Sequence, residues 1–186
     1  SVLLKMGTYG FLRFTLPMLP DATVSFTKPM IALSIIGIIY GAYMALAQTD
    51  IKKLIAYSSV SHLGFCLLGL MTFTEEGVLG GMIQMINHGV STGMLFLMIG
   101  MIYERTHTRM IADYGGIAKI VPMFALFFMI AMLSSVGLPG MNGFVGEFLV
   151  LLGTLKVNVV LGIIAGTGVV WAACYLLWFT KRFLFG

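Results

Sequence analysis

Residues 137–148 of the chain read GLPGMNGFVGEF, and they lie between two apolar runs, Met123–Leu133 and Leu149–Leu155. Proline inside a helix removes a backbone donor and clashes with the preceding turn, and glycine also disfavours a helix. The stretch therefore predicts a helix that is interrupted at about residues 137–143 and is followed by an acid, Glu147. Unpaired backbone groups are costly in lipid, so broken membrane helices occur where protein or a cavity satisfies them. We expect the rest of the chain to hold Glu147 and its partners.

The composition is that of a polytopic membrane protein. Of 186 residues, 59% are hydrophobic and 10% are charged, and the mean hydropathy is +1.02. Soluble domains carry about 25% charged residues. We expect an all-α bundle in contact with the lipid bilayer. The basic pI does not indicate a nucleic-acid partner, because the cations lie at helix ends and form no basic stripe. Cys66 and Cys174 lie inside apolar runs without metal-ligand spacing.

The hydropathy pattern predicts about six transmembrane helices, one of them discontinuous. A loop is expected at 19–29, short connections at 48–53 and 72–77, and a polar segment outside the lipid at 104–116. Thr49 or Asp50 would cap the helix that follows the first of these connections. The expected crossings are 1–18, 30–47, 54–71, 78–103, the interrupted 117–155 and 158–179. Because the chain starts and stops next to apolar runs, we expect it to be an internal part of a longer protein.

The charges favour one orientation. If the broken helix crosses once, seven cations fall on one side of the membrane and two on the other. The positive-inside rule then places the 49–53 and 104–116 segments in the cytoplasm. A re-entrant hairpin would weaken the bias to five against four. The seven are Lys52, Lys53, Arg105, Arg109, Lys119, Lys181 and Arg182; the two are Lys28 and Lys156.

Four ionisable side chains are expected at one depth. At about 1.5 Å per residue, His62 lies about 18 Å inside its helix and His88 about 15 Å inside the next, in a hydrocarbon core about 30 Å thick. Lys5 lies at a similar depth, and Glu147 follows the break. A charge at the bilayer centre costs on the order of 2.5–3.5 kcal/mol, so four such residues indicate a functional site. The alternative is a structural pair of Lys5 and Glu147 with two hydrogen-bonded core histidines.

Polar stripes accompany the two histidines. The spacing i, i+3, i+4, i+7, i+8 puts five polar residues on one helix face, which must meet protein or water. A shorter stripe accompanies His62. Hydroxyls, amides and imidazoles one turn apart could hold a file of water molecules, although interhelical hydrogen bonds are the alternative. The longer stripe is Gln84, Asn87, His88, Ser91 and Thr92; the shorter is Ser58, Ser61 and His62.

Proton relay is the chemistry that these residues suggest. Histidine titrates near neutral pH, and burial moves lysine and glutamate toward their neutral forms. We expect Lys5, His62, His88 and Glu147 to carry the protons. A metal site is disfavoured, because the histidines lack ligand spacing and no cysteine or second acid accompanies them. Nothing resembles a dinucleotide fingerprint or a P-loop, and no cysteine cluster could hold iron–sulfur. We expect no cofactor in this chain.

Five segments resemble, in order, the antiporter-like subunit M (chain 4) family of proton-translocating NADH–quinone oxidoreductase, respiratory complex I. The resemblance covers essentially the whole chain. The matching segments are 3–14 LLKMGTYGFLRF, 50–65 DIKKLIAYSSVSHLGF, 84–89 QMINHG, 103–109 YERTHTR and 137–148.

The resemblance implies a fold of two inverted five-helix repeats, of which residues 1–18 would be the last helix of the first and residues 30–184 the whole second. It implies that Lys5 links the half-channels, that His62 and His88 form the central axis, and that Glu147 is the exit group. The first repeat's glutamate–lysine pair is absent, so these residues alone should not pump. NADH, FMN, iron–sulfur clusters and quinone would bind partner subunits. The localisation would be a membrane, most simply the bacterial inner membrane.

Two related families remain alternatives. Multisubunit cation/proton antiporters and membrane-bound hydrogenases contain paralogous subunits, which often place lysine where this chain has Glu147. A purely structural bundle is the third reading, and it would make the buried charges dispensable.

Overall fold

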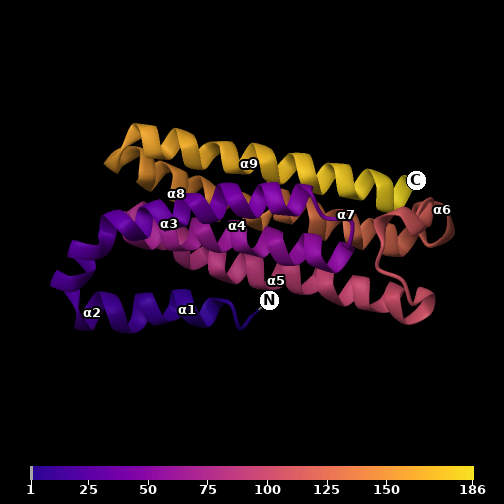
Figure 1. Ribbon diagram of the computed structural model, residues 1–186, viewed down its shortest axis with the longest axis horizontal. Helices are drawn as coiled ribbons and strands as arrows, with labels where there is room; N and C mark the ends of the chain where they lie inside the picture. Colours follow the sequence, from indigo (N-terminus) through magenta and orange to yellow (C-terminus); the bar gives the residue numbers. More distant parts are fainter. Residues whose placement is uncertain (1) are drawn as a thin grey trace.

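The computed structural model describes residues 2–186, in which the regular secondary structure is helical apart from one isolated bridge between Asp50 and Met110 (Figure 1). In chain order the helices are α1 (Lys5–Gly10), the π-helical turn η1 (Phe11–Thr15), α2 (Leu16–Met18), α3 (Pro20–Leu46), α4 (Ile51–Met71), α5 (Glu75–Thr106), the 3-10 turn η2 (Ile111–Asp113), α6 (Ile117–Ile120), α7 (Pro122–Val136), α8 (Asn142–Val157), α9 (Val159–Thr180) and the π-helical turn η3 (Lys181–Phe185).

Four helices of the described chain are long and apolar enough to cross a membrane. They are α3, α4, α5 and the continuous helix formed by α9 and η3, residues Val159–Phe185. Helix α7 is apolar but has only 15 residues, and a span of the hydrocarbon core needs about 20. The all-helical membrane bundle expected from composition is therefore confirmed.

The loop predicted at residues 19–29 is wrong. Helix α3 starts at Pro20 and runs to Leu46, with Pro29 inside it. Proline is well tolerated at the first position of a helix, where its missing N–H has no partner to lose. The buried Thr23 hydroxyl donates to the carbonyls of Leu19 and Thr15, at 2.7 and 3.2 Å, and so ties the start of α3 to the preceding helix. The polar residues between the two prolines therefore extend a helix that hydropathy alone starts ten residues later.

The start of α4 is set by Asp50. Its side chain accepts a hydrogen bond from the Lys53 amide at 3.1 Å, which satisfies a backbone donor of the first turn. Of the two cap residues left open by the sequence, the structure selects Asp50. Thr74 caps α5 in the same way, through the Gly77 amide.

One end of the bundle collects the expected cytoplasmic segments. The Ile51 amide donates to the Arg109 carbonyl at 3.0 Å, and the Ile111 amide donates to the Thr49 carbonyl at 2.9 Å. Gly115 packs against Gly186 at the same end. Five cations of the connecting segments therefore lie at the same end as Lys181 and Arg182.

The opposite end is marked by an ion pair between Lys156, in the last turn of α8, and Glu76, in the first turn of α5. Helix α7 begins near the first end and α8 finishes at this one. Together they run the length of the bundle. Figure 1 shows α7 and α8 in line, with α9 returning alongside them.

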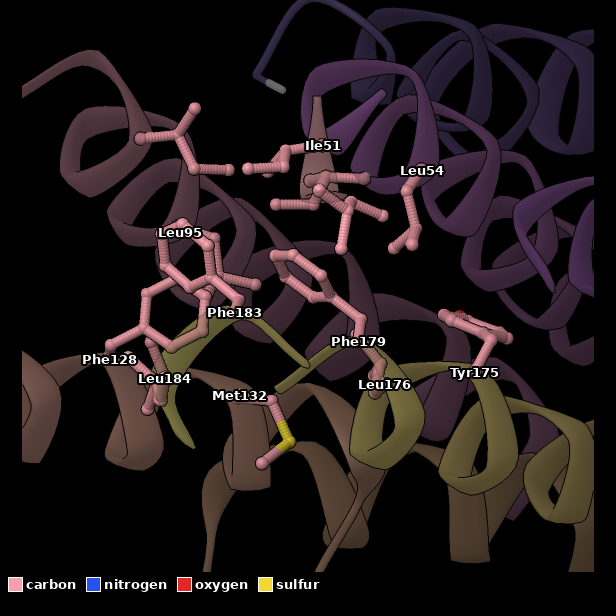
Figure 2. Close-up of a cluster of buried hydrophobic side chains, with 14 of the residues drawn as sticks. Ile51, Leu54, Leu95, Phe128, Met132, Tyr175, Leu176, Phe179, Phe183 and Leu184 are labelled. Carbon is pink, nitrogen blue, oxygen red and sulfur yellow. The ribbon is translucent and has the colours of Figure 1, made fainter. Parts of the chain in front are cut away.

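Two apolar clusters occupy the two ends of the interior. The larger cluster includes Ile51 and Leu54 of α4 together with aromatic residues of α7, α9 and η3 (Figure 2). Phe128 lies 5.8 Å from Phe179 and 5.1 Å from Phe183 between ring centroids. The second cluster is formed by Ile31, Ile38, Phe65, Leu68, Leu70, Met71, Val150 and Ala165.

Along α4 the two clusters leave a gap between Ile55 and Phe65. Ser58, Ser59, Ser61 and His62 lie in that gap, and all of them are buried. The interior is thus apolar at each end and polar at the middle.

Candidate functional site

The polar middle of the bundle holds a row of ionisable side chains from four helices. His62 of α4, His88 of α5 and Glu147 of α8 are buried, with relative exposures of 3%, 2% and 4%. Lys5 comes from α1, which lies along the outer side of α4 and α5. The four side chains predicted for proton relay are therefore neighbours in the structure, although they are separated by up to 142 positions in sequence.

Three contacts join the row from end to end. The Lys5 ammonium hydrogen-bonds Nδ1 of His88. The rings of His88 and His62 lie with their centroids 5.1 Å apart and their planes at 47°. Nδ1 of His62 is 3.1 Å from Oε1 of Glu147. A proton that moved along the row would pass from Lys5 to His88, from His88 to His62 and from His62 to Glu147.

Gln84 is the further partner of Glu147. Its side-chain amide donates to Oε1 of Glu147 at 3.1 Å. Gln84 lies four residues before His88, so the two share one face of α5. That face of α5 therefore places His88 beside His62 and Gln84 beside Glu147.

Glycines allow α8 to lie close to this face. A Cβ on Gly146 would come within 2.4 Å of Oε1 and 2.9 Å of Cβ of Gln84. A Cβ on Gly137, which has φ +78°, would come within 2.7 Å of Oε2 of Glu147. The Glu147 carboxylate thus lies between the break and α5. A side chain at Gly137 would collide with this carboxylate, and a side chain at Gly146 would collide with Gln84.

The break itself is a helix end followed by a helix start. Gly137 adopts the left-handed conformation, and the amides of Leu138 and Gly137 donate to the carbonyls of Leu133 and Ser134, both at 3.2 Å. This pair of bonds is the Schellman arrangement, which satisfies the last carbonyls of α7. The chain re-enters a helix at Asn142, whose carbonyl accepts a 2.6 Å hydrogen bond from the Asn87 side chain.

The predicted polar lining is only partly arranged around the row. All six residues are buried. Gln84 and Ser91 line a cavity between the histidines and the end of α7 that is too small to hold a water molecule. The Ser58 and Ser91 hydroxyls donate to carbonyls of their own helices, Ile55 and Asn87. Thr92 lies next to Ser91 on the same helix.

Ser61, which was also predicted to line the row, makes its side-chain hydrogen bond to another helix. Its hydroxyl donates to the Ile38 carbonyl of α3 at 2.9 Å, so it belongs to helix packing. Gly41 of α3 packs against the backbone of Ser61. This is the interhelical bonding that was the alternative reading of the stripe.

Sequence reasoning missed the residues that the broken helix supplies. Ser134 and Ser135 line the same cavity as His62 and His88. The Ser134 hydroxyl also donates to the side-chain oxygen of Asn142. The signal was available, because Ser134-Ser135 directly precedes the break and Asn142 follows it, in otherwise apolar surroundings.

Four buried side-chain atoms among the described residues have no hydrogen-bond partner. They are Nε2 of His62, Nε2 of His88, Oε1 of Gln84 and the hydroxyl of Tyr175. Each histidine therefore uses Nδ1 for a charged neighbour and keeps Nε2 unpaired. An imidazole in that state can accept a proton on one nitrogen and release one from the other.

These features define a class: an all-helical integral membrane protein with a buried row of ionisable groups beside a discontinuous helix. The chain belongs to the NADH:quinone oxidoreductase/Mrp antiporter transmembrane family, whose family model matches residues 1–172.

Individual relatives agree with this assignment. The chain is 52% identical over all 186 residues to NADH-quinone oxidoreductase subunit M of Rickettsia bellii, and it covers 38% of that protein. It is 43% identical over its full length to NADH-ubiquinone oxidoreductase chain 4 of Chondrus crispus, again covering 38% of the relative. Among solved structures, respiratory complex I from Thermus thermophilus with bound NADH contains a chain that is 39% identical. The TM-score is 0.94, and the match covers 99% of this chain and 39% of that one. The chain thus spans well under half the length of these relatives.

Proposed function

We propose that the chain is part of an antiporter-like subunit M of an NADH–quinone oxidoreductase and moves protons along the row Lys5–His88–His62–Glu147. The observation that carries this proposal is the unbroken set of contacts between those four side chains. A structural bundle gives no reason for four ionisable groups to meet at one depth, because each buried charge is costly in a membrane.

The contacts suggest how a proton passes. The Lys5 ammonium gives a proton to Nδ1 of His88, and His88 releases its other proton from Nε2. His62 accepts at Nε2 and releases from Nδ1 to Oε1 of Glu147, with Gln84 holding that oxygen in place. Moving one charge through 100 mV requires about 2.3 kcal/mol, so the row must be driven. The driving reaction would be quinone reduction by NADH in partner subunits, which would hold FMN and the iron–sulfur clusters.

The resemblance also supplies the finer organisation. Residues 1–18 would close the first repeat and residues 30–184 would form the second, with the break at 137–143. Helices α7 and α8 would together count as one crossing, and α1 to α2 as the end of another, which gives about six. Neighbouring membrane subunits would be the partners. The bacterial inner membrane is the proposed location, and a mitochondrial or chloroplast membrane is the alternative, because the relatives include both bacterial and algal proteins.

The experiment is Glu147→Gln in the full-length subunit, assembled in the complete complex and reconstituted in vesicles. Protons translocated per NADH oxidised should fall to the level of the remaining subunits, while NADH oxidation by an artificial acceptor stays unchanged. Glu76→Gln is the matched control, because Glu76 is a carboxylate at the rim that pairs with Lys156 and touches no member of the row. A Glu147→Gln complex that pumps as well as the control would refute the proposal.

A cation/proton antiporter subunit is the second candidate, because the matching family includes Mrp antiporters. The two are separated by the partner chains that co-purify with the subunit and by sodium dependence. An NADH-oxidising assembly whose translocation persists without sodium supports the first.

A further inference from the structure

We propose that Asn87, Ser134 and Asn142 form a latch that holds the start of α8 on α5 and thereby keeps Glu147 in contact with His62. This role rests on the proposed function, because it assigns positioning residues to the same row. None of the three touches the row's exchanging atoms through its own side chain.

Asn142 is the point at which three elements meet. It is the first residue of α8. Its carbonyl accepts the 2.6 Å bond from Asn87 of α5, and its side-chain oxygen accepts the bond from Ser134 in the last turn of α7. Asn87 and Ser134 are buried, with exposures of 7% and 6%, whereas Asn142 remains accessible on its other side. Both halves of the broken helix are therefore fixed to α5 at one residue.

The start of α8 has little else to hold it. Met141 occupies the N-cap position and provides no side-chain cap, so the first turn lacks the bond that a serine or aspartate normally gives. The Met141 amide donates to the Leu138 carbonyl at 2.9 Å, a contact within the break itself. Removing the bonds to Asn142 would leave this end of α8 tied to α5 by helix packing and by the Gln84–Glu147 bond alone.

Glu147 is placed where a movement of this end matters most. Side chains on a helix lean toward its N-terminus, so the Glu147 carboxylate lies back over the first turn of α8. This explains why Oε2 is next to Gly137 while Oε1 reaches His62 and Gln84. A small displacement of the first turn would lengthen the 3.1 Å bond to His62 directly.

The latch also connects the two ends of the row. Asn87 directly precedes His88, whose ring carries the contact to Lys5. The same turn of α5 thus holds the lysine end through His88 and the glutamate end through Asn87. If this turn of α5 moves when Lys5 gains or loses a proton, Asn87 would carry the movement to Asn142, and the histidine rings would not be involved.

The test uses Ser134→Ala and Asn87→Ala in the full-length subunit of the complete complex. Two readouts are taken: the infrared carbonyl stretch of Glu147, assigned by its absence in Glu147→Gln, and protons translocated per NADH. Each variant should displace the Glu147 band and lower this subunit's own share of translocation, measured as the part that Glu147→Gln removes, about fivefold, the effect of losing one net hydrogen bond. Ser134→Thr keeps the hydroxyl and should restore both. Ser59→Ala is the matched control, because its buried hydroxyl bonds the Ile55 carbonyl of its own helix.

The outcomes separate the latch from the row. An unmoved Glu147 band in both latch variants overturns the latch, even if translocation changes. A displaced band in these variants supports the latch, and it does so even if Glu147→Gln leaves translocation intact, a result that refutes only the proposed function. If Ser134→Ala does not assemble, Ser134→Cys, whose thiol is a weak donor, gives the same comparison.

Discussion

Gly146→Ala is expected to separate α8 from α5 and to disable the row without altering any ionisable group. The new Cβ would stand 2.9 Å from Cβ and 3.0 Å from Cα of Gln84. Carbon atoms in contact prefer separations of about 3.5–4.0 Å, so the two helices must move apart by about 0.5–1 Å. The obstacle includes Gln84 backbone, which cannot rotate away as a side-chain end could.

The displacement decides the fate of the Gln84–Glu147 bond. Adding about 0.5–1 Å to a separation of 3.1 Å takes it to the limit of hydrogen bonding or beyond. Overpacking of this kind costs about 1–3 kcal/mol of stability. We expect a lower melting temperature of the membrane domain and a reduced proton yield per NADH.

The assay compares Gly146→Ala with Gly166→Ala, because no atom lies within 4 Å of a Cβ at Gly166. The control should be neutral or should stabilise α9 by up to about 1 kcal/mol, since alanine is the better helix former. Equal melting temperatures and equal proton yields for the two variants would refute the packing argument.

Three further changes test other parts of the structure. Lys5→Ala should abolish translocation by the subunit in vesicle pumping assays, because it removes the partner of His88. Lys28→Ala, in α3, is the control and should leave translocation intact. Equal losses in the two variants would show that the row is irrelevant. Asp50→Ala should lower the free energy of unfolding by about 1 kcal/mol through loss of the α4 cap, with Thr49→Ala as the control in thermal melts. Ser61→Ala should lower stability by about 1 kcal/mol, because it removes the bond to the Ile38 carbonyl, yet it should leave protons per NADH unchanged. A loss of pumping would support the prediction that Ser61 belongs to the polar lining.

Local chemistry in the sequence predicts much of this architecture. Asp50 before an apolar run marks a helix start, and Gly137-Leu138-Pro139-Gly140 marks a helix end. Hydropathy fails at residues 19–29, because it treats Pro20 and Pro29 as breaks although both fit one helix. The helices that are long enough to cross a membrane are also fewer than the apolar runs, since α7 is too short to do so alone.

The row shows that the depth of a residue in the membrane does not predict the direction in which its side chain points. Counting residues from helix ends places His62, His88 and Glu147 at one level, but level alone does not fix which way a side chain turns. Ser61 and His62 are adjacent on α4, yet Ser61 meets α3 and His62 meets α8. The one-residue difference is a rotation of about 100° on a helix with 3.6 residues per turn, and only the positions of the neighbouring helices decide which face is polar. Ser134 and Asn142 flank the break in the sequence, but their bond spans a break whose geometry no periodicity describes, so the sequence could mark both residues without pairing them.

The two apolar clusters determine the direction in which the row can carry charge. Phe128, Phe179 and Phe183 fill the bundle toward the end that holds Lys181 and Arg182, and Phe65, Leu70 and Val150 fill it toward the other end. A proton leaving His62 along the bundle axis would have to cross one of these clusters, at the cost of a charge in an apolar medium. Lys5 and Glu147 lie instead on different helices at the same level as the histidines. Under the proposed function, the charge therefore moves across the bundle, parallel to the membrane, between a lysine on the outer helix α1 and a glutamate beside the break in α7 and α8.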